Sequence, residues 1–159
     1  MPSSRDPRFV AEHRGGPLKI GQHRELMQWS LRCVGHVLDL YGMQPDERIL
    51  HALRVGRAWT SGQATVGDAR RASVELLALA RELTNPVQIA LVRATGHAVA
   101  TAHMADHSMG GALYAIKAVN CAGKSMEEEW NWQLAQLPLE VKDFVLEVMS
   151  QKAAHFKMN

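Results

Sequence analysis

Apolar residues recur at three- and four-residue steps along most of the chain. In the segment from about residue 22 to residue 41, one such stripe consists of Met27, Leu31, Val34, Leu38 and Tyr41. This spacing places the side chains on one face of an α-helix. The chain shows no sustained alternation of apolar and polar residues, which would be typical of a β-strand. The pattern therefore predicts an all-α protein.

Capping residues divide the rest of the chain into further helices. Side-chain oxygens of Ser, Thr, Asp and Asn accept hydrogen bonds from free backbone N–H groups at a helix start, and proline suits the first helical position. Such signals predict helix starts at Pro45, Thr65, Asn85, near Ser108, at Ser125 and at Pro138. We expect a single compact bundle of six to seven helices.

Small residues occupy most faces of the segment from Pro86 to Thr101. A helix that is apolar nearly all round is usually buried, and small side chains let neighbouring helices approach closely. We therefore expect a buried Ala-rich helix at the centre of the bundle. One helix from Pro86 to Ala122 would be long for a compact domain, so we expect a break between His103 and Ser108. Gly110 and Gly111, inside the helix that follows this break, indicate close packing there or a further local break.

Length and charge fit one helical domain over residues 1–159. Residues 1–17 contain proline, glycine and charged residues, and we expect an irregular N-terminal arm that Phe9 and Val10 anchor. Eighteen basic and sixteen acidic residues are interspersed, with a net charge of +2. A nucleic-acid-binding protein would usually show a strong basic excess, so we expect no such partner. Cys33 and Cys121 form no CxxC motif and are expected to be buried free thiols.

No stretch approaches the length of a membrane span, and the first residues contain no apolar signal segment. These features predict a cytoplasmic protein that does not bind membranes.

Four residues are candidates for metal binding: His97, His103, Asp106 and His107. Imidazole nitrogens and carboxylate oxygens are zinc ligands, and His103 and His107 would share one face of a continuous helix. Met104, however, stands where the zinc-binding HExxH motif has glutamate, and His97 lies about 240° around the helix from His103. We favour a structural role, with the histidines bonded to helix-end carbonyls and Asp106 as a cap. No cofactor is expected. The alternative is a metal-binding domain or metal-dependent enzyme with zinc or iron.

A group of arginines is divided between the second and third predicted helices, and it consists of Arg54, Arg57, Arg70 and Arg71. Such a cluster can hold an anionic ligand through forked hydrogen bonds. The favoured interpretation is a solvated face on which Arg71 pairs with Glu75 one helical turn away.

An acidic and aromatic segment, Glu127-Glu128-Glu129 with Trp130 and Trp132, is the candidate partner-binding surface. Tryptophan is enriched among the residues that dominate protein interfaces. The plainer interpretation is that acidic residues suit the positive end of a helix dipole and that one tryptophan belongs to the core.

The stretch GHAVATAHMADHSMGGALYAIKAV resembles the central signature of the immunity-protein-five-like family of bacteria. Similar stretches are DPRFVAEHRGGPL, HRELMQWSLRCVGHVL, RAWTSGQATVGD, ARRAS and LPLEVKDFVLEVM, so the resemblance covers nearly the whole chain. It implies an all-α protein, encoded beside polymorphic toxins, that binds and neutralises a cognate toxin by covering its active site. No catalytic residues carry over from the family, and an enzyme is the less favoured class.

Two other functions stay open beside the toxin-binding one. The first is the metal-dependent function already described. The second is a self-associating scaffold, a homo-oligomer in which the Ala-rich helices pack between subunits. Inhibitors of nucleases often carry an acidic face. This chain is slightly basic, and only the segment from Glu127 to Glu129 offers such a face.

Overall fold

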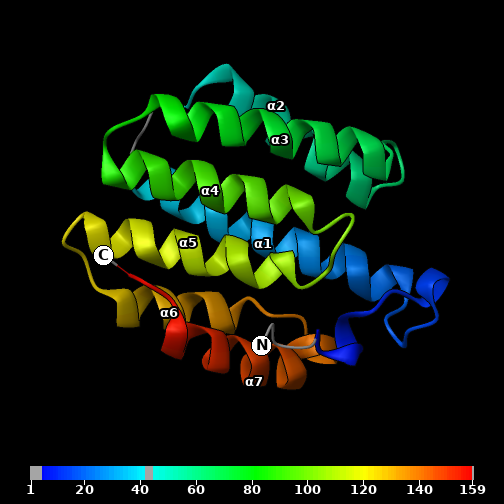
Figure 1. The fold of residues 1–159 in the computed structure, drawn as a ribbon. Helices are drawn as coiled ribbons and strands as arrows, with labels where there is room; N and C mark the ends of the chain where they lie inside the picture. Colours follow the sequence, from blue (N-terminus) through cyan, green and yellow to red (C-terminus); the bar gives the residue numbers. More distant parts are fainter. Residues whose placement is uncertain (1–4, 42–44, 159) are drawn as a thin grey trace.

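Seven α-helices form the described part of the fold in the computed structural model, which describes residues 5–41 and 45–158 (Figure 1). The helices are α1 (Ile20–Leu40), α2 (Glu47–Thr60), α3 (Val66–Glu82), α4 (Pro86–Ala100), α5 (His107–Cys121), α6 (Met126–Ala135) and α7 (Leu139–His155). The described residues contain no strand, and an isolated bridge joins Ala11 to Leu18. The all-α prediction is confirmed. None of the described helices is both long and apolar enough to cross a membrane.

Helix α4 lies at the centre of the bundle and contacts α1, α2, α3 and α5 (Figure 1). Its small and apolar side chains are buried on several faces, which confirms the predicted Ala-rich central helix. The predicted break is also present, because α4 ends at Ala100 and α5 begins at His107. The two helices then run side by side. A Cβ on Gly111 would collide with Ser30 Oγ and would lie 3.2 Å from the Ala98 Cα, so this glycine sets the close approach.

Local side-chain caps explain two of the predicted helix starts. At α3, Thr65 Oγ1 accepts from the Asp68 N–H and the Asp68 carboxylate accepts from the Thr65 N–H. At α4, Asn85 Oδ1 accepts from the N–H groups of Val87 and Gln88. Each cap satisfies backbone donors that have no partner inside the helix.

The predicted start of the second helix at Pro45 is wrong. Asp46 caps α2 by accepting the Arg48 N–H at 2.8 Å, so the helix begins at Glu47, after the proline. The preference of proline for the first helical position gives way here to the stronger preference of aspartate for the cap position.

Two hydrophobic cores lie on opposite sides of α1 and α5. The first core is built from α1, α2, α3, α4 and α5. It includes Met27, Trp59, Leu76 and Leu91. The second core joins α1 and α5 to α6, α7 and the N-terminal arm, and its largest buried residue is Trp29. Helices α1 and α5 therefore have buried side chains on both of their faces.

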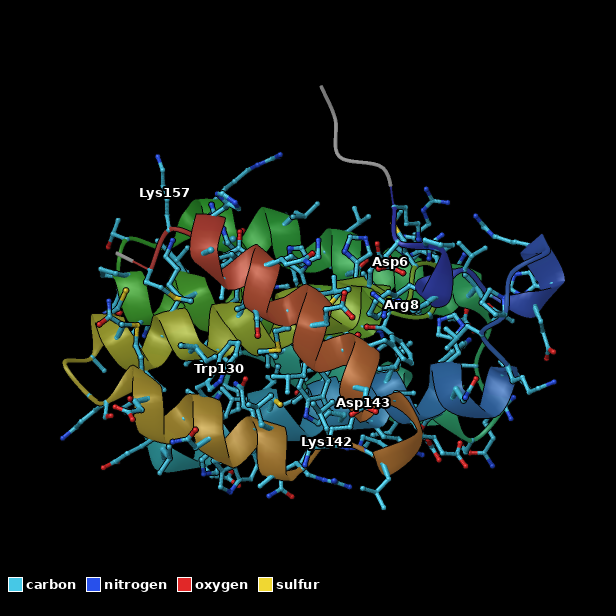
Figure 2. All side chains as sticks on the ribbon, turned by 90° about the horizontal axis from the view of Figure 1, so that it is seen from below. Asp6, Arg8, Trp130, Lys142, Asp143 and Lys157 are labelled. Carbon is cyan, nitrogen blue, oxygen red and sulfur yellow. The ribbon has the colours of Figure 1, made fainter. Side chains whose placement is uncertain are left out.

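The N-terminal arm packs against α7, as Figure 2 shows for the segment that carries Asp6 and Arg8. Two short 3₁₀ helices, Pro7–Phe9 and Glu12–Arg14, give the arm its path. Phe9 is fully buried and meets the Phe144 ring edge-on at 5.1 Å between centroids. Arg8 pairs with Glu147 at 3.0 Å. Phe9 is thus the predicted anchor, whereas Val10 is only half-buried.

The two cysteines are free and differ in burial. Cys33 on α1 is buried in the second core, as predicted, and burial raises the pKa of its thiol. Cys121 at the end of α5 is only half-buried, so the prediction of burial is wrong there.

Candidate functional site: a groove over the central helix

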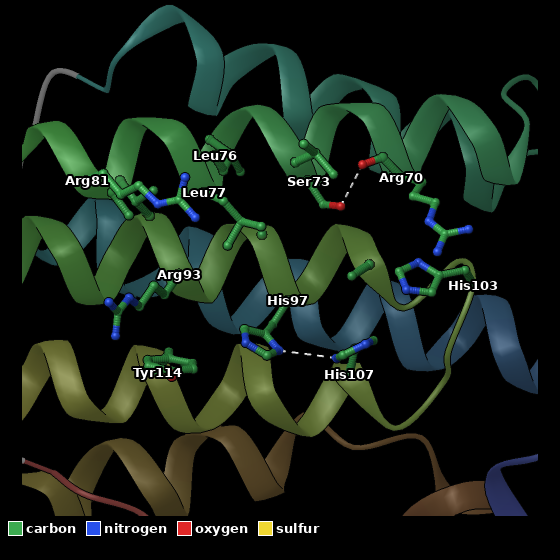
Figure 3. A pocket seen from close by; sticks show the side chains of 15 residues that line it. Arg70, Ser73, Leu76, Leu77, Arg81, Arg93, His97, His103, His107 and Tyr114 are labelled. Atoms are coloured by element: carbon green, nitrogen blue, oxygen red, sulfur yellow. Dashed lines mark hydrogen bonds between the residues drawn. The ribbon is translucent and has the colours of Figure 1, made fainter.

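A groove of about 540 Å³ runs along the outer face of α4, between α3 and α5 (Figure 3). This volume lies within the range of about 300–1,000 Å³ that ligand pockets commonly have. The groove exists because small side chains line α3 and α4 where larger ones would fill the space: Ser73, Ala80, Gly96 and Ala100. The same small residues that let α4 pack centrally leave its outer face hollow.

Apolar side chains that face the groove are unusually exposed. Val74 and Leu77 on α3 show 57% and 56% of their surface to solvent. Single exposed apolar residues are common, but two that line one recess form a coherent apolar surface. The α3 side of the groove is therefore apolar in its middle.

Three arginines line the groove: Arg70 and Arg81 from α3 and Arg93 from α4. Within the described residues none of the three forms an ion pair with a carboxylate, and no Asp or Glu lines the groove. Arginines outside the groove do have acidic partners, for example Arg71 on α3 with Asp68 and Arg48 on α2 with Glu82. The groove is therefore a positively charged recess.

The structure divides the arginine cluster that the sequence suggested. Arg54 pairs with Glu47, whereas Arg70 faces the groove. Arg71 pairs instead with Asp68, three residues before it on α3, so the predicted ion pair between Arg71 and Glu75 is wrong. Sequence reasoning missed Arg81, Arg93 and Tyr114 as groove residues. Their spacing in the chain gives no sign that they line one recess.

Three histidines complete one side of the groove. His97 comes from α4, His107 from the first residue of α5, and His103 from the segment between these helices. The Nδ1 atoms of His97 and His107 lie 3.3 Å apart, so one ring donates and the other accepts. The His97 ring also stacks on Tyr114 at 5.1 Å and lies over Gly110, where a Cβ would come within 2.6 Å of it.

All three imidazoles are uncharged at neutral pH. Burial lowers the pKa of His97 to about 4, and the positive charges of Arg93 and Lys152 act in the same direction, as does a proton on His107 at acid pH. Burial is also the main reason why the pKa values of His103 and His107 are lowered. The Nδ1 atom of His103 is buried without a hydrogen-bond partner among the described residues. The groove thus offers neutral hydrogen-bonding rings beside charged guanidinium groups.

The four metal-ligand candidates do not converge on one point. His97 and His107 are in contact, and the His103 ring lies 5.3 Å from that of His107. Asp106 forms an ion pair with Arg5 of the arm, at 3.3 Å between Oδ1 and Nε. Across residues 5–41 and 45–158, no three His, Cys, Asp or Glu side chains are placed so that they could hold a metal ion.

The predicted capping roles around the helix break are replaced by other contacts. Asp106 stands at the cap position of α5 but its side chain makes no capping hydrogen bond, so that prediction is wrong. The helix-end carbonyl of Thr101 is instead bound by Nε2 of the buried His23, at 2.5 Å. His23 precedes Met27 by four residues on the inner face of α1, which is the sequence signal that could have identified it.

The acidic segment on α6 has two exposed members and one buried member. Glu127 and Glu128 are exposed, whereas Glu129 is 2% exposed and pairs with His36 at 2.8 Å. Trp132 stacks on the same imidazole, with 3.6 Å between ring centroids and 8° between ring planes. Burial raises the pKa of Glu129, which His36 partly offsets. Glu129 therefore supports the fold, and the exposed acidic surface is limited to its two neighbours.

Trp130 is half-buried and packs against the second core, as one of the two tryptophans was expected to do. Figure 2 shows it on α6.

Comparison with known proteins gives one match. No curated protein and no solved structure matches the chain significantly. The family described as "Imm-5 like putative immunity protein" matches residues 16–140, a range that contains α1 to α6 and every residue that lines the groove. The match covers well over half of the chain, and the protein therefore belongs to the Imm-5-like immunity protein family.

Proposed function

We propose that this protein binds a cognate toxin and neutralises it without catalysis. The observation that carries the proposal is membership of the immunity protein family over residues 16–140. An immunity protein acts by occupying its toxin, so its essential property is affinity rather than chemistry. A complex that persists at cellular concentrations needs a Kd in the nanomolar range or below, which corresponds to about −12 kcal/mol.

Features of the fold are consistent with a binding role. Helices α3, α4 and α5 hold the groove in a packed arrangement, and α4 and α5 are locked together at Gly111. A binding surface that is already formed loses little conformational entropy when a partner docks, which favours affinity. The recess also combines apolar side chains with hydrogen-bonding and charged groups, which is the usual make-up of a specific binding site.

The test is co-expression with the toxin candidate encoded beside this gene. We expect growth of the toxin-expressing cells to be restored and a stable complex to be recovered from them. An inactivated toxin variant should bind equally well, because the proposal places no step of catalysis in the complex. If no neighbouring gene product is neutralised or bound, the proposed function is wrong.

A further inference from the structure

The charges of the groove are concentrated at its two ends. Arg70 and Arg81 are eleven residues apart on α3, which corresponds to about 16 Å along the helix axis. Figure 3 shows Arg81 and Arg93 at one end of the groove, and Arg70 with His103 at the other. The exposed Val74 and Leu77 lie on α3 between these ends. The groove is therefore positively charged at both ends, with an apolar surface on α3 between them.

The arginines are suited to carboxylates. A guanidinium group presents a rigid fork of donors that matches a carboxylate in two parallel hydrogen bonds. None of these three has an acidic partner in the described part of the chain, and no carboxylate inside the groove competes for them. The neutral imidazoles of His97, His103 and His107 add donors without adding charge.

A nucleic acid fits the groove less well than an acidic protein segment. A phosphate backbone carries charge at every nucleotide and calls for a continuous basic track, whereas the α3 side of this groove is apolar in its middle. The net charge of +2 also lacks the basic excess of nucleic-acid-binding proteins.

From these observations we propose that the groove docks a short acidic segment of the cognate toxin, with a carboxylate at each end and an apolar side chain between them. This inference rests on the proposed function and assigns its contact site. Two carboxylates about 16 Å apart correspond to about five residues of extended chain. One carboxylate pairs with Arg81 and Arg93, the other pairs with Arg70, and the apolar side chain packs on Val74 and Leu77.

The experiment measures binding of the inactivated product of the neighbouring toxin gene to charge-reversed variants. The groove variants are Arg70→Glu and the double variant Arg81→Glu/Arg93→Glu. All three side chains are exposed, so the fold should be retained, and thermal unfolding checks this. We expect the Kd to rise at least tenfold in each variant, and the wild-type Kd to rise with salt.

Two matched controls locate the contact. Arg57→Glu reverses an exposed arginine on α2, outside the groove, and Glu127→Lys/Glu128→Lys reverses the exposed acidic pair on α6. We expect both to change the Kd by less than about threefold, because surface substitutions away from a contact usually have small effects. Replacing the matching toxin carboxylate with lysine should restore binding to the Arg81→Glu/Arg93→Glu variant.

The outcomes separate the two proposals. If the groove variants bind like the wild type, or if only the α6 variant loses binding, the groove inference is overturned and the proposed function stands. Binding of a 20-nucleotide single-stranded DNA that the arginine reversals abolish would also overturn it. If the wild-type protein binds no neighbouring gene product, both proposals fall together.

Discussion

At the scale of single residues, His97 shows how packing fixes a protonation state. Its ring lies between His107 Nδ1, the Tyr114 ring and the backbone of Gly110. A proton added there would place a charge in a mostly buried site already surrounded by Arg93, Lys152 and a second imidazole, which is why its pKa falls to about 4. The neutral pair of His97 and His107 supplies one donor and one acceptor when the two rings adopt complementary tautomers.

The low pKa of His97 predicts acid sensitivity. In the unfolded chain this histidine has an ordinary pKa of about 6.5, so the unfolded state takes up the proton first as the pH falls. The contribution of neutral His97 to the free energy of unfolding is fully present above pH 6.5. It is lost as the pH falls to the folded pKa of about 4. Between pH 7 and pH 5, His97 alone should lower the free energy of unfolding by about 2 kcal/mol.

The measurement is urea unfolding of the wild type and of His97→Gln at both pH values. The variant should lose less stability between pH 7 and pH 5, while His23, His103 and His107, whose pKa values are also lowered, keep part of the dependence. Equal losses in the two proteins would show that His97 titrates normally in the folded state.

Two glycines in helices should respond oppositely to alanine. Gly111→Ala places a methyl group against Ser30 Oγ and Ala98, so it should lower the free energy of unfolding by about 1–3 kcal/mol. Gly35 lies inside α1 with nothing within 4 Å of its Cβ position. Gly35→Ala should therefore raise stability by up to about 1 kcal/mol, because alanine has the higher helix propensity. Chemical unfolding of both variants tests the pair, and a stabilised Gly111→Ala protein would contradict the close approach of α4 and α5.

At the scale of helices, the sequence predicted those starts that depend on a few neighbouring residues. Thr65 with Asp68 caps α3, and Asn85 caps α4 by accepting from Val87 and Gln88. All these partners lie within three residues of each other, so local chemistry was enough. Asp106 was predicted wrongly because its carboxylate pairs with Arg5, a residue far away in sequence. A cap can be predicted from sequence only where no distant partner competes for its side chain.

The cap of the central helix should contribute measurably to stability. Asn85→Ala removes the acceptor for two backbone N–H groups, and we expect the free energy of unfolding to fall by about 1 kcal/mol. Asn131→Ala is the matched control, because Asn131 is exposed inside α6 and alanine favours a helix interior. Thermal unfolding should show a lower Tm for the first variant and no loss for the second. Equal melting temperatures for all three proteins would contradict the capping role.

At the scale of the whole molecule, the sequence predicted the all-α bundle and its buried central helix, because both follow from the periodicity of apolar and small residues. The groove could not be predicted in the same way. Its arginines, histidines and tyrosine come from three helices and one connecting segment, and only packing brings them together. The pair formed by His36 and Glu129 escaped prediction for the same reason, since these residues lie on α1 and α6.

The contact between the arm and α7 also sets an order of events during synthesis. Every buried residue of the first core precedes residue 120, so this core can close before α6 and α7 have been synthesised. The second core needs Phe9 from the start of the chain and Val145 and Met149 from near its end. Domains tend to fold as the chain emerges from the ribosome. Phe9 and Trp29 therefore stay exposed to chaperones or to aggregation until the residues of α7 have left the ribosome.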